Sequence, residues 1–571
     1  MTEGVLLWTK GKIFMRDKIR IFALGGLDER GKNIIVVEIN QDIFIIDAGI
    51  KHPDRSLPGV DLIIPDYRYL EENKDRVKAY LVSHGHNEQM GAIPFMYKSI
   101  KAPIYCSKAT AAMISDYGIN YLKKPVTFNF KIVNPSDDVE IAGHKVHFFQ
   151  TCHSMICSSG IAIDTTEGTI IYSGDFIVEY NSDIGHNHDL NKLAKIAENN
   201  VLLLMTESSG ATSLGYASPN HKLTPYLNRV LFESKGRTYI ALFDKNIYGL
   251  EEILKFATLN NKKVIFYNEF AKKLYEKLQP CGIFVPGKNV ITSDDELLRI
   301  KATDTIIVMM EEGEHLYELM SQLARGEIED KRFIISPNDS FLAACPPQGG
   351  LEIIATDAID DLFRTGAHIT NLNKKTYISM TAREDDLKSM ISLLKPKYYL
   401  PVSGEYRHLL ANAMIAVHSF TTYNHRNVFI LDNGVPVDII DGEAKITNTI
   451  IKNGDLMVDG IGVGDVKQEV IDDRQKLSED GVIIAALAIS KENNQIIAGP
   501  DIQMRGFVFL KESEAILREI TRLFVDTVNS SLSHNKSIEE AKNIFVDKAT
   551  KFIKKETARF PLIVPIVEVI E

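Results

Sequence analysis

The sequence predicts an α/β protein made of several domains, and three observations carry this prediction. Residues 19–207 are rich in apolar runs with strand character, residues 208–372 alternate such runs with helical patterns, and residues 448–571 form a separate α+β stretch. A chain of 571 residues is long enough for about two to four domains, each with its own hydrophobic core.

In the first part, we expect strands within residues 33–47, 77–82 and 145–150. Residues 33–47 and 145–150 are alternating runs with strand character, since apolar stretches are interrupted by polar residues. Residues 77–82 form an apolar run, and the stretch from Met90 to Pro94 after it looks like the entry of a helix. This order fits half of an αββα sandwich, in which helices cover two packed sheets.

Four short apolar strands are expected in the middle part, with helical patterns such as residues 250–256 between them. They cover residues 237–243, 264–267, 304–309 and 332–335. Strands that alternate with helices indicate a parallel sheet. The middle part should therefore be an α/β domain.

The tail carries clear helix signals. Residues 511–525 place apolar side chains at helical spacing, and Ser537 with Glu540 forms a capping box at the start of another helix. Glycines at 460, 462 and 464 lack the strand-to-helix context of a dinucleotide loop, so we interpret them as a turn.

Composition and charge limit the class of protein. No run of about 18 apolar residues is present and the first 20 residues lack an apolar signal core, so we expect a cytoplasmic protein with no membrane partner. The net charge of −11 argues against indiscriminate coating of nucleic acid, because phosphate binding relies on clustered Lys and Arg. The net charge does not exclude a local basic groove. Five scattered cysteines indicate buried thiols.

The most informative motif is His84-x-His86, which follows the apolar run 77–82. Two neutral imidazoles at a strand end can bind one cation, yet an isolated His-x-His is weak evidence. Three further groups strengthen it, since Asp47, His153 and Asp175 each follow a strand-like run. We therefore expect these strand ends to converge on a metal site.

Together these motifs resemble the metallo-β-lactamase superfamily, and the flanking segments resemble ribonuclease J of its β-CASP family. The segments that carry the narrower resemblance are residues 22–33, 59–67, 401–407, 459–465 and 505–508. The resemblance implies a metallo-β-lactamase sandwich at 1–207 and 373–447, an inserted β-CASP domain at 208–372, and a small α+β C-terminal domain at 448–571. It also implies action on RNA, in mRNA turnover and rRNA maturation.

The resemblance implies one complete metal site. His84, His86, His153 and the bridging Asp175 would hold one divalent ion, zinc or manganese, which suits this ligand chemistry. Asp47 is expected to orient a ligating histidine.

The family's second metal site is degenerate in this sequence. Its aspartate is replaced by Glu88, and its two histidines by Gln89 and Ser403. Glu88 and Asp175 remain as the candidate catalytic carboxylates. We therefore expect one divalent ion and an empty second site.

The expected RNA contacts also depart from the family pattern. Two family histidines, one near the leaving group and one in the phosphate pocket, correspond here to Thr381 and Tyr248. Loss of a general acid costs about 10²- to 10⁴-fold in rate, so hydrolysis should be severely impaired. The residues expected to meet RNA or its phosphates are Lys245, Asn246, Ser379, Thr381 and Ser403.

Four other histidines are assigned no metal. His186 and His188 are expected to be solvated loop residues, and His144 and His147 to be structural residues of one strand.

Three functions compete. The first is a weakly catalytic or non-catalytic ribonuclease J paralogue that binds single-stranded RNA and pairs with an active ribonuclease J. The resemblance implies either a homo-oligomer or a hetero-oligomer with such an active paralogue. The second is an active 5′-3′ exo- or endoribonuclease that uses one metal. The third is a hydrolase of small molecules such as lactones, against which the RNA-sized insertion and tail argue.

Overall fold

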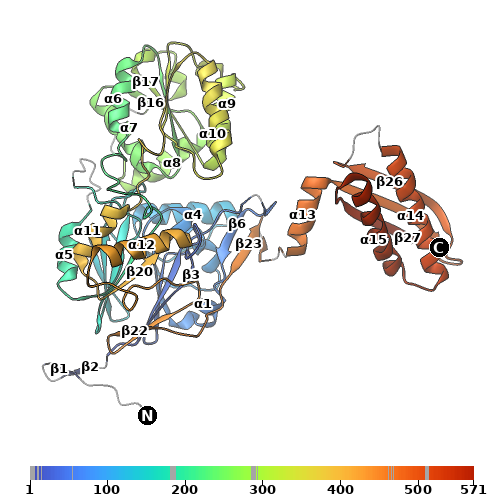
Figure 1. The fold of residues 1–571 in the computed structure, drawn as a ribbon. Helices are drawn as coiled ribbons and strands as arrows, with labels where there is room; N and C mark the ends of the chain where they lie inside the picture. Colours follow the sequence, from blue (N-terminus) through green and yellow to red (C-terminus); the bar gives the residue numbers. More distant parts are fainter. Residues whose placement is uncertain are drawn as a thin grey trace. The chain divides into compact units, whose positions relative to one another are not determined.

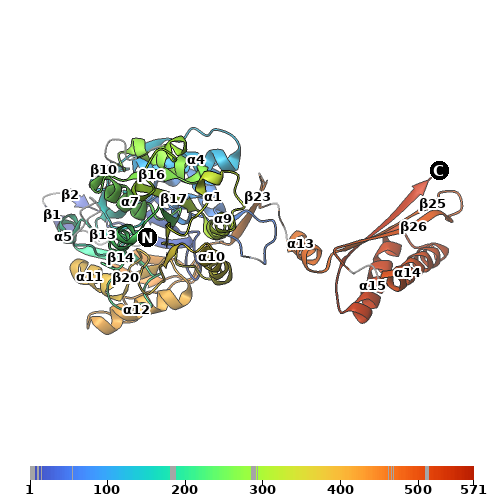
Figure 2. The ribbon, with the colours of Figure 1, turned by 90° about the horizontal axis from the view of Figure 1, so that it is seen from above.

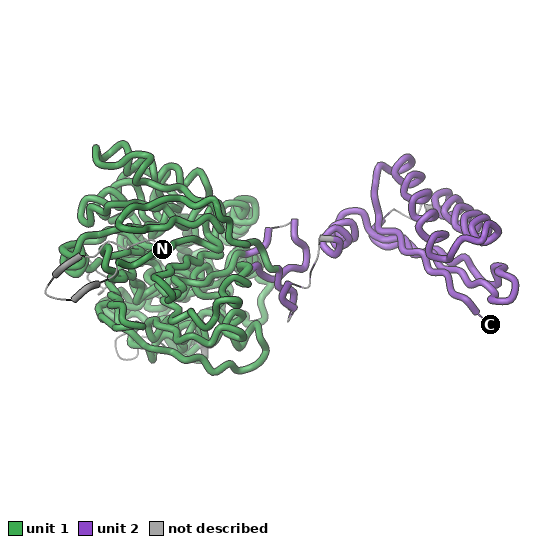
Figure 3. Tube along the Cα trace, turned by 90° about the horizontal axis from the view of Figure 1, so that it is seen from below, with its two compact units in different colours: residues 1–51, 64–456 green, residues 52–63, 457–571 purple. Residues whose placement is uncertain are grey.

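The computed structural model of the protein describes residues 7–9, 12–14, 16–54, 56–180, 188–284, 291, 293–460, 462–464, 466, 468–507 and 513–570. The chain forms two compact units (Figure 3). Unit 1 comprises residues 1–51 and 64–456, and unit 2 comprises residues 52–63 and 457–571. The domain boundaries drawn from the sequence stay predictions.

Two sheets form the centre of unit 1 (Figure 1). The first has the order β22 (Glu443–Ile446), β21 (Val437–Ile440), β3 (Ile19–Gly25), β4 (Ile34–Ile39), β5 (Asp42–Ile46), β7 (Val77–Leu81), β8 (Ile104–Cys106), β9 (Phe130–Ile132). The second has the order β10 (Asp138–Ile141), β11 (His144–Gln150), β12 (Ser159–Thr165), β13 (Gly168–Tyr172), β14 (Val201–Glu207), β20 (Tyr398–Val402).

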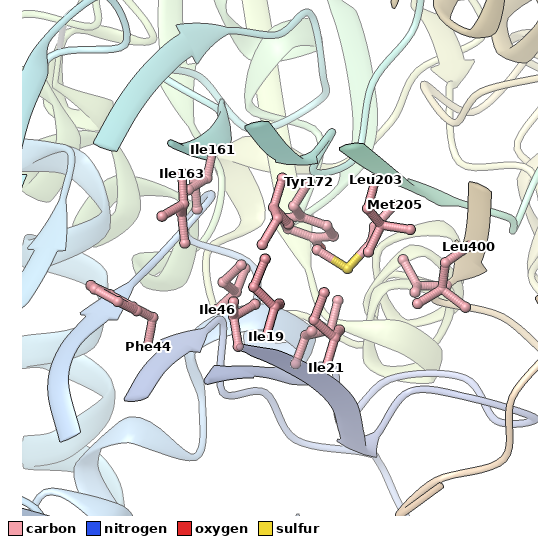
Figure 4. Close-up of a cluster of buried hydrophobic side chains, with 14 of the residues drawn as sticks. Ile19, Ile21, Phe44, Ile46, Ile161, Ile163, Tyr172, Leu203, Met205 and Leu400 are labelled. Atoms are coloured by element: carbon pink, nitrogen blue, oxygen red, sulfur yellow. The ribbon is translucent and has the colours of Figure 1, made fainter. Parts of the chain in front are cut away.

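The two sheets pack face to face through one apolar core. Figure 4 shows side chains of the first sheet, such as Ile21 and Ile46, opposite Ile161, Tyr172 and Leu203 of the second. Burial of each such side chain contributes about 1.5–3 kcal/mol. This core therefore holds together the two sheets whose strand ends carry the candidate site.

Helices cover the outer faces of both sheets. Buried side chains of α5 (Leu190–Ala197), α11 (Glu384–Leu394) and α12 (Tyr406–Ser419) share a core with the second sheet, and α12 lies along β20 (Figure 2). On the first sheet, Tyr69 of α1 (Arg68–Glu72) packs edge-on against Phe22 of β3. Three more helices follow strands of this sheet in the chain, namely α2 (Asn87–Met90), α3 (Ile93–Met96) and α4 (Lys108–Leu122), and α4 contacts both β9 and α3. The four-layer sandwich expected from the sequence is confirmed.

The inserted part is a five-stranded parallel sheet with the order β16 (Lys263–Phe266), β17 (Thr305–Glu311), β15 (Thr238–Phe243), β18 (Ser340–Ala343), β19 (His368–Asn371). Alternate residues of β15 face two different cores: Ile240 and Leu242 pack with α6 (Thr224–Glu233), α7 (Ile247–Leu259) and α8 (Glu269–Leu278), whereas Tyr239 packs with α9 (Gly313–Arg325) and α10 (Glu352–Arg364). Helices therefore cover both faces, as expected for an α/β domain.

One expected strand of this domain is wrong. Residues 332 and 333 lie in the 3-10 turn Lys331–Phe333, and residues 334 and 335 follow it without forming a strand. Asp330 begins the turn, because its carboxylate accepts a hydrogen bond from the backbone N–H of Arg332 at 3.0 Å and binds the Arg332 guanidinium. The strand is instead β18, whose four residues are all buried.

Unit 2 contains an α+β core. Its sheet has the order β26 (Ile496–Arg505), β25 (Val482–Ser490), β27 (Leu562–Ile570), and α14 (Ser513–Ser533) and α15 (Ile538–Thr557) pack on it. The capping box of α15 is confirmed, since Ser537 Oγ accepts from Glu540 N at 3.2 Å and Glu540 Oε2 accepts from Ser537 N at 2.8 Å. Of the helix expected at 511–525, residues 511 and 512 lie outside the described residues.

Residues 52–63 belong to unit 2 although they precede most of unit 1 in sequence. Val60 and Ile63 form a small core with Ile471 of α13 (Gln468–Asp480). Arg474 of the same helix donates to the carbonyl oxygens of Pro58 and Gly59, at 3.3 and 3.1 Å.

The remaining elements are short. Strand β6 (Leu62–Pro65) forms a sheet with β23 (Asp455–Asp459) and β24 (Gly462–Val463), and the turn between the last two contains Gly460 with a φ of 58°. Strand β1 (Leu7–Thr9) pairs antiparallel with β2 (Lys12–Phe14). Further 3-10 turns cover Lys74–Arg76, Gln279–Cys281, Asp294–Glu296 and Ala302–Asp304.

Candidate metal centre

Four of the residues expected to bind metal lie together. One side-chain donor atom from each of His84, His86, His153 and Asp175 lies within 4.8 Å of the others. His86 Nδ1 is 3.0 Å from His84 Nε2 and 3.2 Å from His153 Nε2. Asp175 Oδ2 is 3.8 Å from Nε2 of both His84 and His153. Three imidazoles and a carboxylate fit a single zinc or manganese ion.

The centre lies where strands of both sheets end. His84 and His86 follow β7 of the first sheet, whereas His153 follows β11 and Asp175 follows β13 of the second. Close packing fixes the loop after β5 against α2: a Cβ at Gly49 would lie 1.6 Å from the carbonyl oxygen of Glu88. Only glycine at position 49 therefore permits this close approach. The approach positions the segment from His84 to Gln89 against the loop after β5.

Burial keeps the three imidazoles neutral. It lowers the pKa of His84 well below its usual value, that of His86 to about 4, and that of His153 to about 3. Neutral imidazole is the form that binds a metal, so the histidines need lose no proton when an ion enters at neutral pH.

A different partner orients each imidazole through its other nitrogen. His84 Nδ1 is 2.9 Å from Ser83 Oγ, His86 Nε2 donates to the carbonyl oxygen of Lys245 at 3.2 Å, and His153 Nδ1 donates to that of Met380 at 2.6 Å. Such partners fix the tautomer and the direction of a ligating ring. No sequence pattern indicates these roles for Ser83 or for the two carbonyl groups.

Asp47 is connected to the candidate ligand His84 through hydrogen bonds with Ser83. Its carboxylate accepts from Ser83 N at 2.7 Å and from Ser83 Oγ at 2.8 Å, and from Tyr172 OH at 3.0 Å. Burial raises the pKa of Asp47 to about 7, against the lowering effect of these hydrogen bonds. This placement is compatible with the orienting role expected from the sequence.

Glu207, which no sequence pattern indicates, connects two segments next to the centre through hydrogen bonds. Its Oε1 accepts from the backbone N–H of Phe176 at 3.1 Å and of Ala382 at 2.7 Å. These residues adjoin Asp175 and the segment that contains Met380. Burial raises the pKa of Glu207 well above its usual value, and the charge of Asp175 adds to this.

The residues at the expected second metal position do not form a second ligand set. Glu88 is paired with the ammonium group of Lys245. Gln89 donates its amide Nε2 to Asp175 Oδ2 at 3.3 Å. Ser403 is buried after β20, and its main-chain oxygen accepts from Ser208 N and Ser209 Oγ, both at 3.3 Å. A second divalent ion needs oxygen or nitrogen acceptors here, so these residues do not fit one.

The expected RNA-contacting residues lie on several loops. Asn246 caps α7, accepting from Gly249 N at 2.9 Å, and its amide donates to Tyr377 OH at 2.7 Å. Ser379 is exposed, with its hydroxyl 3.3 Å from that of Thr381. Their roles toward RNA, like those of Lys245 and Ser403, stay predictions.

Of the four histidines assigned no metal, the three that the structure describes are not part of the ligand group, and the expectation for one of them needs a correction. His188 is buried, because it packs edge-on against Phe176 and its Nδ1 donates to the carbonyl oxygen of Ile177, so its expected solvation is wrong. His186 lies outside the described residues. His144 and His147 lie on β11, as expected.

Comparison with known proteins first defines the class. Residues 27–219 match the family described as "Metallo-beta-lactamase superfamily", and residues 469–570 match "Ribonuclease J C-terminal domain". A crystal structure described as a protein of unknown function from Enterococcus faecalis V583 shares the fold, with a TM-score of 0.51 and 17% identity, and covers 74% of this chain and 100% of its own. The chain thus has the fold and a metal-ligand cluster of a metallo-β-lactamase superfamily member.

Full-length relatives narrow the assignment. "Ribonuclease J 2" of Staphylococcus epidermidis is 32% identical over 96% of this chain and 98% of its own length. The proteins of that name from Staphylococcus saprophyticus and Staphylococcus aureus are 32% and 31% identical over the same shares. The chain belongs to the ribonuclease J family. Within the described part of the chain, none of the helices has the length and apolarity needed to cross a bilayer.

Proposed function

We propose that this protein binds single-stranded RNA and acts in RNA processing and decay, including mRNA turnover and rRNA maturation, with weak or no hydrolysis of its own. It would work as the partner of an active ribonuclease J. The observation that carries this proposal is the ion pair between Glu88 and Lys245, which lies beside a complete set of candidate ligands for one ion.

The chemistry of phosphodiester hydrolysis explains why these contacts matter. A bound divalent ion supplies a hydroxide nucleophile near neutral pH, and a pair of ions also stabilises the leaving oxygen. In this chain, Asp175 accepts a hydrogen bond from the Gln89 amide. The hydroxyl of Thr381 is too weakly acidic to serve as a general acid near neutral pH. The leaving oxygen would therefore receive little compensation for its charge.

A second candidate is an active 5′-3′ exo- or endoribonuclease with one metal. The complete set His84, His86, His153 and Asp175 favours it. In that case the ion pair between Glu88 and Lys245 would have to open, so that the Glu88 carboxylate could accept a proton or bind a water molecule.

The test is incubation of the purified chain with a 5′-monophosphorylated single-stranded RNA and manganese, with cleavage and binding measured in parallel. His84→Ala removes a ligand, and His144→Ala is a matched control because His144 lies on β11, outside the four-ligand set. We expect RNA binding by all three proteins and little cleavage. Cleavage that His84→Ala abolishes and His144→Ala retains would establish the one-metal ribonuclease instead. Absence of RNA binding would contradict both candidates.

The partner role needs its own experiment. We expect the chain to co-migrate with an active ribonuclease J from the same cell in size-exclusion chromatography with light scattering. Independent elution of the two proteins at micromolar concentrations, roughly the range of weaker specific complexes, would remove this part of the proposal.

A further inference from the structure

The ion pair between Glu88 and Lys245 connects two parts of unit 1. Glu88 lies on α2 of the sandwich, two residues after the candidate ligand His86. Lys245 lies between β15 and α7 of the inserted domain. The Lys245 ammonium group thus reaches from the inserted domain to the edge of the metal centre.

Lys245 is held at both ends. Its carbonyl oxygen accepts the hydrogen bond from His86 Nε2 at 3.2 Å, while its ammonium group binds Glu88 Oε1. The Glu88 and Lys245 side chains are 20% and 25% exposed, so solvent screens the pair only in part. The charges of Asp244 and Glu312 also act on this ammonium group. The negative charges of three carboxylates therefore favour the charged form of this ammonium group.

The other group on this side of the centre is also a donor. Gln89, which follows Glu88 on α2, points its amide N–H at Asp175 Oδ2. Asp175 and Glu88 are the carboxylates that a second ion would need as ligands. Both already contact N–H groups of the protein, Glu88 through the Lys245 ammonium group and Asp175 through the Gln89 amide.

We propose that the Lys245 ammonium group is a built-in cation of this centre, which neutralises Glu88 in place of a second divalent ion and restricts the chain to one ion. This inference rests on the one-metal part of the proposed function. It concerns metal stoichiometry, so it can fail whether or not the protein cleaves RNA.

The experiment is a count of manganese ions per chain. The full chain is stripped with a chelator, titrated with manganese in a calorimeter, and assayed for metal content after gel filtration. We expect one ion in the natural chain and a second, weaker equivalent in Lys245→Met, because Glu88 then no longer pairs with an ammonium group. Adding Glu88→Gln to Lys245→Met should return the count to one.

Lys222→Met is the matched control, since its ammonium group pairs with the buried Glu179 at 3.3 Å, outside the four-ligand set. It should bind one ion. Lys245→Gln serves as the second variant if Lys245→Met does not fold, as judged by thermal melting. Two ions in the natural chain, or a single ion in a folded variant that lacks the Lys245 charge, would overturn the proposal.

Discussion

At the residue scale, the candidate ligands depend on groups that are far apart in the chain. Ser83, the carbonyl group of Lys245 and that of Met380 each orient one imidazole. A local change in any of the three segments can therefore alter the geometry of the whole centre.

Asp47 provides a test of this dependence. Asp47→Asn removes the negative charge that accepts both hydrogen bonds from Ser83, and Ser83 contacts His84. We expect the affinity for manganese or zinc to fall about 10- to 100-fold, measured by competition with a chromophoric chelator.

The control for Asp47→Asn is Glu252→Gln. Glu252 is equally a buried carboxylate that accepts backbone N–H groups, those of Leu223 and Thr224, but it lies in the inserted domain. It should lower the free energy of unfolding and leave metal affinity unchanged. Equal affinities in Asp47→Asn and the natural chain would show that Asp47 does not support the ligands.

The sequence predicted the grouping of the four candidate ligands better than their surroundings. His84, His86, His153 and Asp175 could be predicted because each side chain carries the metal-binding chemistry itself. The carbonyl partners have no such signature, since every residue has a carbonyl group. The pair of Glu88 with Lys245 joins positions 157 residues apart, and only the fold brings them together.

At the scale of elements, one edge of the second sheet carries a histidine between two carboxylates. His147 of β11 is 2.9 Å from Asp138 on β10 and 3.0 Å from Asp164 on β12. The hydrogen bond with Asp164 contributes most to raising the pKa of His147, against the effect of burial. For Asp138, burial is outweighed by Lys192 and His147, which lower its pKa to about 2.

This arrangement predicts a pH-dependent contribution to stability. The folded pKa of His147 lies above the unfolded value of about 6.5, so its contribution is complete below that value and is lost as pH rises through the folded pKa. His147→Gln should lower the free energy of unfolding by about 1–3 kcal/mol at roughly pH 6, and by less at roughly pH 9. Urea unfolding at both pH values measures this difference.

His144→Gln, on the same strand, is the control for pH dependence. His144 is 3.7 Å from Asp42, a longer contact than either contact of His147. If His147→Gln and His144→Gln lose stability equally at both pH values, the carboxylates do not stabilise a charged His147.

Elements were predictable where the apolar pattern alone determines them. Residues 77–82 and 264–267 contain β7 and most of β16, because their apolar runs fill a sheet position. Residues 332–335 have the same apolar character, but Asp330 turns the backbone before them. A short side-chain cap thus outweighed strand propensity.

At the scale of the whole molecule, the chain passes between the two units more than once. Residues 52–63 belong to unit 2, and Arg474 holds their backbone at Pro58 and Gly59. Arg474→Ala should weaken this attachment by about 1–2 kcal/mol, roughly a 5- to 30-fold change in local opening. Hydrogen exchange of a peptide covering residues 52–63 measures it.

Lys476→Ala is the control for Arg474→Ala, since Lys476 lies on the same helix and pairs with Asp473 at 3.7 Å. It should leave exchange in residues 52–63 unchanged. An equal effect of the two substitutions would mean that helix α13 as a whole, and not the Arg474 guanidinium, secures the segment.

The placement of residues 52–63 has a consequence for synthesis on the ribosome. Their partners in unit 2 begin at Met457, about 400 residues later, which at about 5–20 residues per second means a delay of roughly 20–80 s. During that time Val60 and Ile63 have no apolar partner from α13. The nascent chain must therefore stay soluble with this segment open, and completion of unit 2 waits for the last fifth of translation.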